Sequence, residues 1–454
     1  MNRRSVLAWF GSGLVVIGLG GYHQRRRLRR WPDRDALHAA QEIEYPTVSH
    51  PSYLRPTESH LTDALDDLAE RVDAARERWP DEEVEADDEE YMANSGRRFE
   101  RAKATLEDLE EQRRTFEELS AAERLEVLGD LRTALGGAEQ AVALADLQRG
   151  DRDRDDIITD LEALRDEYET ALDDLSYVAS SLSWAATAYG ELDEWLDNAR
   201  GSIRMGERYV HGEGTIDTVE PQYSAARAAS ARARLADADR LRDSLEETAR
   251  ENTTAHSFEQ ELEDAYERLE ERTDTVIEQV EFDIEDGADE VRSHASEISL
   301  REYIAVHDGP DDAYEKELLA LAVRRKVEHH AYALIHSEFE DAPATQHFDA
   351  SIPEFDTTGA DVRDAKNRAA VAFDDRIRTD GDDPLVRHLC ATLVKRLDRQ
   401  ERRLGRHLDA INDDAADEWT VDLERTRLRY REIEELATAI PAAIAAATGN
   451  ADHA

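Results

Sequence analysis

The chain has 454 residues, of which 40% are hydrophobic and 36% are charged, so it is long enough for two or three domains with cores of their own. Its formal net charge is −48, from 105 acidic and 57 basic residues. This balance argues against a nucleic-acid-binding protein, because contact with a phosphate backbone needs clustered Lys and Arg on the binding surface.

The charged residues predict a protein adapted to high salt. Only five of the bases are Lys and the rest are Arg, and together with the acid excess this resembles the proteins of extreme halophiles. In ordinary salt so many like charges repel one another and loosen the folded state, whereas molar salt shortens the screening length to about 3 Å. A disordered acidic chain is the alternative, but apolar residues recur at helical spacing through most of the sequence.

Residues 1–30 predict a membrane-targeting segment with a basic flank. Residues 5–22 carry no charge, and eighteen uncharged residues are just enough to span a bilayer core as a helix. The pair Arg3-Arg4, followed by Ser-Val-Leu, resembles a twin-arginine export signal. The five Arg after the segment predict the opposite orientation, because positive flanks prefer the cytoplasmic side. We expect a cell-membrane protein with one N-terminal membrane segment. The export-like motif weakly favours a location of the remaining chain outside the cytoplasm.

Residues 31–56 contain four Pro in a polar stretch and predict an extended linker away from the membrane. From Thr57 the pattern becomes helical, with apolar residues every three or four positions until Pro80 ends the first helix. The acidic run at 81–90 predicts a solvated hinge or a helix start. It lacks the alternating ligands and central Gly of a calcium loop.

Residues 152–200 carry the longest helical pattern in the chain. Apolar residues alternate at spacings of three and four for more than five heptads, which predicts a seam that a partner helix must cover. Within this stretch, residues 176–190 contain no charge, so we place the centre of the folded bundle there. A packed core is the favoured interpretation, and a ligand pocket lined by Tyr177, Trp184 and Tyr189 is the alternative.

The remaining elements are also predicted to be helical. Ser120 and Glu123 form a capping box that joins two helices within residues 91–149. The Gly-rich stretch from Gly201 to Pro221 predicts a loop. We find no strand pattern and no repeat of fixed period. Further helices are predicted at 222–252, 256–306, 312–339, 359–379, 384–412 and 416–447.

Two folded units are predicted, at 57–306 and 312–447, because the break at residues 307–310 contains Gly and Pro. The first unit is more coiled-coil-like, the second has shorter helices, and residues 448–454 form a polar tail. The fold class is therefore all-α, with long antiparallel helical hairpins or a coiled-coil-like bundle behind an N-terminal membrane segment.

The strongest metal-binding candidates are His329, His330 and His336. His329 and His336 are seven residues apart, hence two turns apart on one helix face, which is too far for one metal ion. The chain contains no His-Glu-x-x-His and no Glu-x-x-His, the usual ligand spacings on helices. We therefore predict no metal site and no cofactor. The only cysteine, Cys390, excludes an intrachain disulfide and is predicted to be a buried small side chain rather than a nucleophile.

The sequence analysis favours a membrane-tethered helical scaffold or protein-binding module, in contact with the membrane through residues 5–22. A protein partner or self-association is expected at the helical seams, and no catalytic residue and no nucleic acid is predicted. The alternative is a hydrolase or small-ligand-binding protein with a site between bundle helices, near the three aromatic residues or the three histidines. A self-associating rod in high salt would favour the scaffold, and a stable monomer with a closed cavity would favour the alternative.

Overall fold

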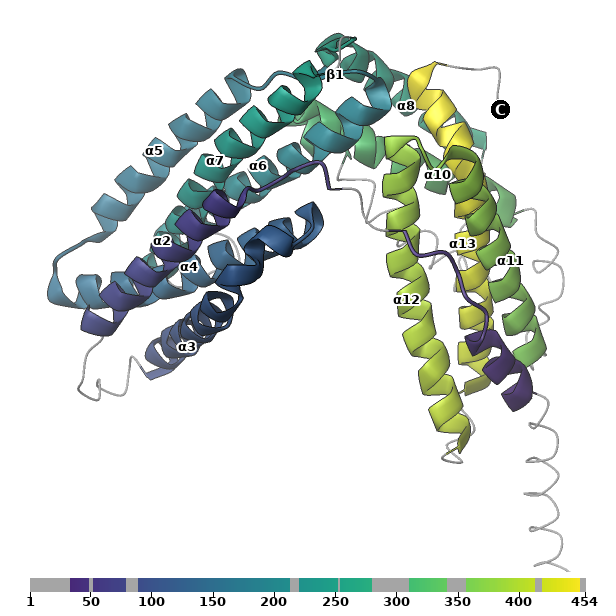
Figure 1. Cartoon of the computed structure of the whole chain (residues 1–454), viewed down its shortest axis with the longest axis horizontal. Coiled ribbons are helices and arrows are strands. Elements are labelled where there is room, and N and C mark those ends of the chain that lie inside the picture. Colours follow the sequence, from purple (N-terminus) through teal and green to yellow (C-terminus); the bar gives the residue numbers. More distant parts are fainter. Residues whose placement is uncertain are drawn as a thin grey trace, which may run out of the picture.

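The structure, a computed structural model, describes residues 33–48, 52–78, 89–212, 220–251, 254–279, 310–340, 357–412 and 419–449. Most residues in these ranges are helical, which confirms the all-α prediction (Figure 1). The long helices are α2 (Glu58–Arg78), α3 (Glu89–Gln112), α4 (Ala121–Arg149), α5 (Arg154–Asp173), α6 (Leu182–His211), α7 (Pro221–Arg250), α8 (Glu259–Gln279), α10 (Leu319–Glu340), α11 (Gly359–Asp380), α12 (Pro384–Asn412) and α13 (Trp419–Thr448). A short 3-10 helix, η2 (Arg113–Glu118), follows α3.

Several predicted features lie outside the described residues. They include the membrane segment at 5–22 with its basic flank, residues 81–88 of the acidic run, the end of the helix predicted at 256–306 and most of the polar tail. Within the described ranges, no helix is both long enough and apolar enough to cross a membrane.

Two helical bundles meet at one end and splay apart, so that the molecule has the outline of an arch (Figure 1). Helices α2 to α7 form one bundle, α8 and α10 to α13 form the other, and α6 packs against α10 where they meet. Helix α8, which the predicted division assigned to the unit at 57–306, packs along α10 and α13. Arg268 of α8 donates a hydrogen bond to the carbonyl oxygen of Ala447 at 2.7 Å. In the structure, α8 therefore belongs with the C-terminal helices.

The segment predicted as an extended linker is instead a strap that lies along both bundles (residues 33–48 and 52–56). Residues 33–41 are helical, and Leu37 is fully buried. The Asp33 carboxylate accepts the backbone N–H of Gly359 at 2.8 Å, at the start of α11. A Cβ at Gly359 would overlap the carbonyl oxygen of Asp33, so glycine permits this close contact. Further along, Leu54 is fully buried beside α6. The linker prediction was wrong because apolar residues among the prolines pack onto the helices.

The apolar seam predicted as continuous over residues 152–200 is divided between two helices in the structure. Helix α5 ends at Asp173 and α6 begins at Leu182, where the Ser181 side chain caps the backbone N–H of Trp184. Between them, β1 (Val178–Ala179) pairs antiparallel with β2 (His256–Ser257), although no strand was predicted. Tyr177 and Ala179 of the intervening segment are buried, and the partly buried Leu175 and Val178 continue the apolar spacing across the break.

Other helix boundaries also differ from those predicted. Helix α6 continues through residues 201–211, which were predicted as a loop, and ends at Gly212 with φ 68°. The helix predicted at 312–339 is interrupted by a turn in which Glu317 has φ 64°, and α10 starts after it. The capping box before α4 is confirmed. The Ser120 hydroxyl accepts the Glu123 N–H at 3.3 Å, and the Glu123 carboxylate accepts the Ser120 N–H at 2.8 Å.

The apolar seam is covered by helices of the same chain. Leu161 and Leu164 of α5 are buried, as are Leu192 and Leu196 of α6, and these two helices pack against each other and against α7. Among the described residues, Val371 is the one large apolar side chain with high exposure, at 54%. Intramolecular packing therefore accounts for the burial of this seam.

Candidate functional site

The aromatic residues proposed as a pocket lining form a packed cluster. The rings of Tyr177 and Tyr189 lie edge to face with their centroids 5.4 Å apart, and Trp184 lies 5.9 Å from Tyr189. Tyr53 of the strap adds a fourth ring 6.0 Å from Trp184. Edge-to-face contacts at these distances stabilise aromatic cores. The three side chains therefore fill space with one another, as the core interpretation expects.

The hydroxyl of Tyr177 has a specific partner at the start of α10. It accepts the backbone N–H of Leu319 at 3.1 Å and lies 3.4 Å from both carboxylate oxygens of Asp193. The Asp193 carboxylate in turn accepts the N–H of Leu321 at 3.0 Å. The first N–H groups of a helix have no partner within the helix. Tyr177 and Asp193 therefore cap α10 from a different bundle.

A second buried carboxylate holds the strap. Glu191 of α6 accepts the backbone N–H groups of Tyr53 at 2.9 Å and Leu54 at 3.2 Å. Burial raises the pKa of Glu191 to about 7, although these two N–H groups act in the opposite direction. Burial likewise raises the pKa of Asp193 to about 7 against its hydrogen bond from Leu321. We call Tyr177, Glu191 and Asp193 the clasp, because they join the strap, α6 and α10.

The histidine candidates lie on α10, and two of them are buried between helices. His329 is 1% exposed and His330 is 4% exposed. The His330 Nδ1 atom lies 3.0 Å from the Thr273 hydroxyl of α8. Burial, with a contribution from Arg272, lowers the pKa of His330 to about 4, so its ring is neutral near pH 7. The side chain of His336 lies outside the described part of the chain.

The described residues contain no group of three or more His, Cys, Asp or Glu side chains placed to hold a metal ion. Cys390 is buried on α12, and burial raises the pKa of its thiol to about 12. A thiol that stays protonated near neutral pH is a poor nucleophile. The chemistry available at these predicted positions is therefore that of packed side chains.

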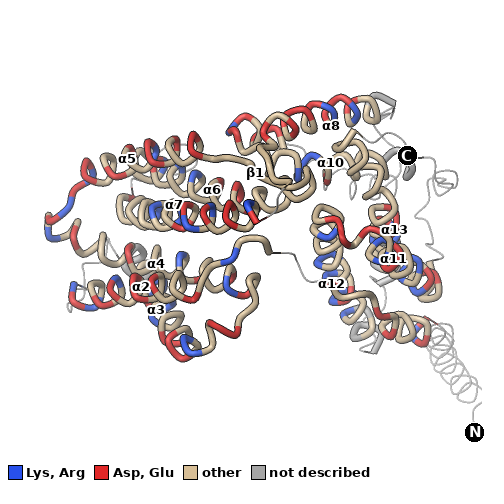
Figure 2. Tube along the Cα trace, turned by 45° about the horizontal axis from the view of Figure 1, so that its top comes forward, with Lys and Arg blue, Asp and Glu red and all other residues tan. Residues whose placement is uncertain are grey.

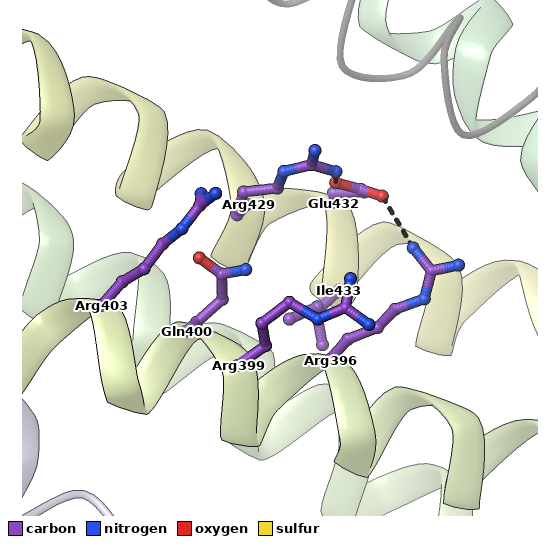
Figure 3. A pocket seen from close by; sticks show the side chains of 7 residues that line it. All are labelled: Arg396, Arg399, Gln400, Arg403, Arg429, Glu432 and Ile433. Carbon is purple, nitrogen blue, oxygen red and sulfur yellow. Dashed lines mark hydrogen bonds and ion pairs between the residues drawn. The ribbon is translucent and has the colours of Figure 1, made fainter. Parts of the chain in front are cut away.

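A polar cleft that the sequence analysis did not identify lies between α12 and α13 (Figure 3). On α12, the lining residues are spaced by three or four positions and so share one helix face, as do those on α13. The cavity volume is about 40 Å³, several times what one water molecule needs. The cleft is lined by Arg396, Arg399, Gln400, Arg403, Arg429, Glu432 and Ile433.

One carboxylate holds two of the four arginines in the cleft. Glu432, which is 4% exposed, accepts from Arg429 at 2.7 Å and from Arg396 at 3.3 Å, through different oxygens. Arg396 also lies over the ring of Tyr332, 4.9 Å from its centroid. Four guanidinium groups and one carboxylate line the cleft, and the carboxylate of Glu328 on α10 is a further partner of Arg396, at 3.5 Å.

The side chain of Gln400 lies between these arginines and is 4% exposed. Figure 3 shows its amide pointing from α12 toward α13, between Arg403 and Arg399. Its Oε1 atom is buried and has no hydrogen-bond partner among the residues that the structure describes. A buried acceptor without a donor costs about 1–3 kcal/mol, so such atoms are uncommon in folded proteins. The cleft thus combines four arginines with an acceptor that lacks a donor within the described ranges.

A sequence signal for this cleft was present on α12. Basic residues outnumber acidic ones on this helix although the whole chain is strongly acidic, and Figure 2 shows Lys and Arg along it. A helical face of arginines matches neither a catalytic motif nor a metal-ligand spacing, so this pattern did not lead to a predicted site. The basic residues of α12 are Arg387, Lys395, Arg396, Arg399, Arg402, Arg403 and Arg406, and its acidic residues are Asp398, Glu401 and Asp409.

Comparison with known families divides the chain in two. Residues 59–252 match a family model described as a domain of unknown function (DUF8262), and residues 259–449 match another, described as a domain of unknown function (DUF8264). The second match begins at the start of α8. No curated protein and no solved structure matches the chain.

Proposed function

We propose that the protein is a membrane-tethered helical binding module and that the cleft between α12 and α13 receives an anionic group. The observation that carries this proposal is the gathering of four arginines at one cleft in a chain of net charge −48. Guanidinium groups bind oxyanions through paired N–H donors, which makes arginine the usual residue for such sites. We infer no catalytic step.

The energetics of the cleft support a ligand rather than a purely structural role. Like charges that share a partly buried site repel more strongly than they do in water. Glu432 compensates part of this repulsion through its contacts with Arg396 and Arg429. A bound anion would compensate more of it, and would contact guanidinium groups from both helices.

The membrane tether rests on the uncharged residues 5–22, and the point where the chain enters the fold is consistent with it. Asp33 contacts the start of α11, so the predicted membrane segment precedes that end of the C-terminal bundle. Long antiparallel hairpins such as α6 and α7 would then extend away from the tether. A C-terminal tag and protease treatment of intact cells test the sidedness. Loss of the tag places the bulk outside, and survival until lysis places it in the cytoplasm.

A scaffold for protein partners is the second candidate, and the clasp favours it because it fixes two bundles in one arrangement. Light scattering of the purified full-length protein in high salt separates the two functions. A stable monomer supports a ligand-binding module, whereas a self-associating rod supports a scaffold whose partner is another copy of the chain.

Thermal unfolding with added oxyanions tests the binding function. A ligand that binds only the folded protein at a hundred times its Kd stabilises it by about 2.7 kcal/mol, so inorganic phosphate or sulfate should raise the Tm of the full-length protein. The double variant Arg399→Gln with Arg403→Gln should lose this increase. Arg402→Gln with Arg406→Gln removes the same charge from the same helix outside the cleft and should retain it. A wild-type Tm that no oxyanion changes would overturn the proposal.

A further inference from the structure

We infer that a second site lies between α5, α6 and the residues before α10, and that it binds a small zwitterion, namely an α-amino acid with an apolar side chain. We call this site the junction pocket, because the two bundles meet there. It shares no lining residue with the cleft between α12 and α13, so it does not depend on the anion-binding function. Its volume of about 340 Å³ falls within the usual range for small-molecule sites, roughly 300–1,000 Å³.

The junction pocket has an apolar part. Tyr168 and Leu172 of α5 are four residues apart and so share one helix face, and Ile203 of α6 lines the pocket with them. Tyr168 is 5% exposed and Ile203 is 4% exposed, so both side chains belong to the packed interior as well as to the pocket. Side chains of this kind favour contact with a hydrocarbon group of a ligand.

Some of the charged residues around the junction pocket already neutralise one another. Arg165 of α5 pairs with Glu207 of α6. Lys316 pairs with Asp197 of α6 at 3.0 Å and also with Asp312. These contacts hold the walls of the pocket together, and we therefore do not count these residues among the groups that bind a ligand.

Five other charged residues line the junction pocket without such contacts. Their charged groups form no hydrogen bond and no ion pair with any residue in the described ranges. The positive ones lie on α6, and the negative ones lie on α5 and just before α10. Opposite charges thus face one pocket without meeting, and a ligand with one charge of each sign would join them. The five are Arg200, Arg204, Glu169, Glu315 and Glu317.

Tyr168 and Arg200 are suited to the carboxylate of the ligand. The Tyr168 hydroxyl and the Arg200 Nη1 atom are buried and have no hydrogen-bond partner within the part of the chain that the structure describes. Burial raises the pKa of Tyr168 above its ordinary value, while Arg200 acts in the opposite direction, so the hydroxyl keeps its hydrogen near pH 7. Arg200 could turn toward the hydroxyl oxygen, but the hydroxyl hydrogen would then still need an acceptor, because a guanidinium group has none. A carboxylate accepts from both groups.

Glu315 and Glu317 are suited to the ammonium group of the ligand. Both precede α10, on the other side of the pocket lining from the arginines of α6 in the chain. The backbone at Glu317 is fixed by the clasp, because its carbonyl oxygen accepts the Tyr177 hydroxyl at 3.3 Å. A purely anionic ligand would be repelled by these carboxylates, and a purely cationic one by Arg200 and Arg204. A zwitterion avoids both repulsions.

Titration calorimetry on the full-length protein, in detergent and high KCl near pH 7, tests the inference with three probes. L-Leucine carries both charges, leucinamide lacks the negative charge, and 4-methylpentanoate lacks the positive charge, while all three have the same hydrocarbon group. We expect leucine to bind at least about tenfold more tightly than either analogue, the factor that corresponds to one hydrogen bond to a charged group.

Variants assign each end of the ligand to its side of the pocket. Arg200→Gln should weaken leucine and 4-methylpentanoate about tenfold and leave leucinamide unchanged, and Tyr168→Phe should act in the same way by a smaller factor. Glu317→Gln should weaken leucine and leucinamide and leave 4-methylpentanoate unchanged. Arg208→Gln on α6 and Glu162→Gln on α5 remove the same charges outside the pocket and should change none of the affinities.

Each contrary outcome overturns the inference. Equal affinities for the three probes would mean that the hydrocarbon group alone is bound. Leucine binding that is unchanged in both Arg200→Gln and Glu317→Gln would place the ligand elsewhere. Binding of none of the probes would mean that the charged side chains close on one another instead. Unfolding temperatures without ligand confirm that each variant is folded, and the phosphate and sulfate measurements on the cleft remain a separate test.

Discussion

The clasp and the cleft are both polar clusters between packed helices, and they differ in how their polar atoms are satisfied. In the clasp, the carboxylates of Glu191 and Asp193 accept backbone N–H groups from the strap and from α10. In the cleft, four arginines and Glu432 line the site, Arg396 also pairs with Glu328, and Gln400 has an acceptor without a donor among the described residues. Carboxylates that bind backbone N–H groups hold elements of the fold together. Several arginines that line one cleft are a candidate for an anion site.

Removal of a clasp carboxylate should have the largest effect on stability. Asp193→Ala leaves the N–H of Leu321 without its buried acceptor and removes one of the two acceptors of the Tyr177 hydroxyl, so we expect a loss of about 3 kcal/mol and a lower Tm. Asp243→Ala on α7 removes an exposed carboxylate and should change stability by less than about 0.5 kcal/mol. Equal changes in the two variants would show that the clasp does not join the bundles.

The pH dependence of stability should distinguish the clasp from the cleft. The pKa values of Glu191 and Asp193 are raised to about 7 in the folded state, above their ordinary values of 4.5 and 3.8. The folded protein therefore holds more protons than the unfolded chain between about pH 4 and 7, and stability should fall as pH rises through that window. The contribution of each group is on the order of 3–4 kcal/mol.

Urea unfolding at pH 5 and pH 8 measures this difference. In Asp193→Asn, a neutral side chain of the same shape, the loss between the two pH values should be smaller than in the wild type. In Arg399→Gln, which alters only the cleft, it should equal that of the wild type. A loss of stability in Asp193→Asn equal to that of the wild type would show that this carboxylate is ionised throughout the range.

Added salt should raise the stability of the unliganded protein and lower the affinity of the cleft for anions. We expect these changes to be smaller than those from the Asp193 variant and from pH. Between 0.1 M and 1 M KCl the screening length falls from about 10 Å to about 3 Å, so repulsion among the surface carboxylates weakens and the Tm of the unliganded protein should rise. The same screening should lower the affinity of the cleft for phosphate a few-fold. Differential scanning fluorimetry and calorimetry at both salt concentrations measure the two changes. A Tm that falls with KCl would contradict adaptation to high salt.

Periodicity and capping rules predicted the helices well where each helix has its own start signal. The capping box at Ser120 fixed the start of α4, and Pro384 marks the start of α12. The break between α5 and α6 was missed, because Leu175 and Val178 of the connecting segment continue the apolar spacing, although they are only partly buried. The strap was missed because prolines obscured Leu37 and Leu54, whose burial depends on helices hundreds of residues away.

The candidate site was less accessible to sequence analysis than the fold. The arginine face of α12 is visible in the sequence at spacings of three and four. However, its significance depends on α13, which brings Arg429 and Glu432 opposite it, and on the burial of Gln400. Tertiary packing determines both, and no local pattern encodes which helix faces α12. The aromatic and histidine candidates were prominent for the opposite reason, since residues that build cores also resemble ligand-binding groups.

The path of the strap has a mechanical consequence if the proposed membrane tether holds the N-terminus. The strap first contacts the C-terminal bundle through Asp33 and then reaches Glu191 in the other bundle. Tension on the N-terminal segment would therefore load the contact between Asp33 and α11 before it reached the clasp. The hydrogen bonds along the strap would break one after another, while the packing of α6 against α10 would continue to join the two bundles. The strap would thus spread a pulling force over successive contacts before the force reached the junction of the bundles.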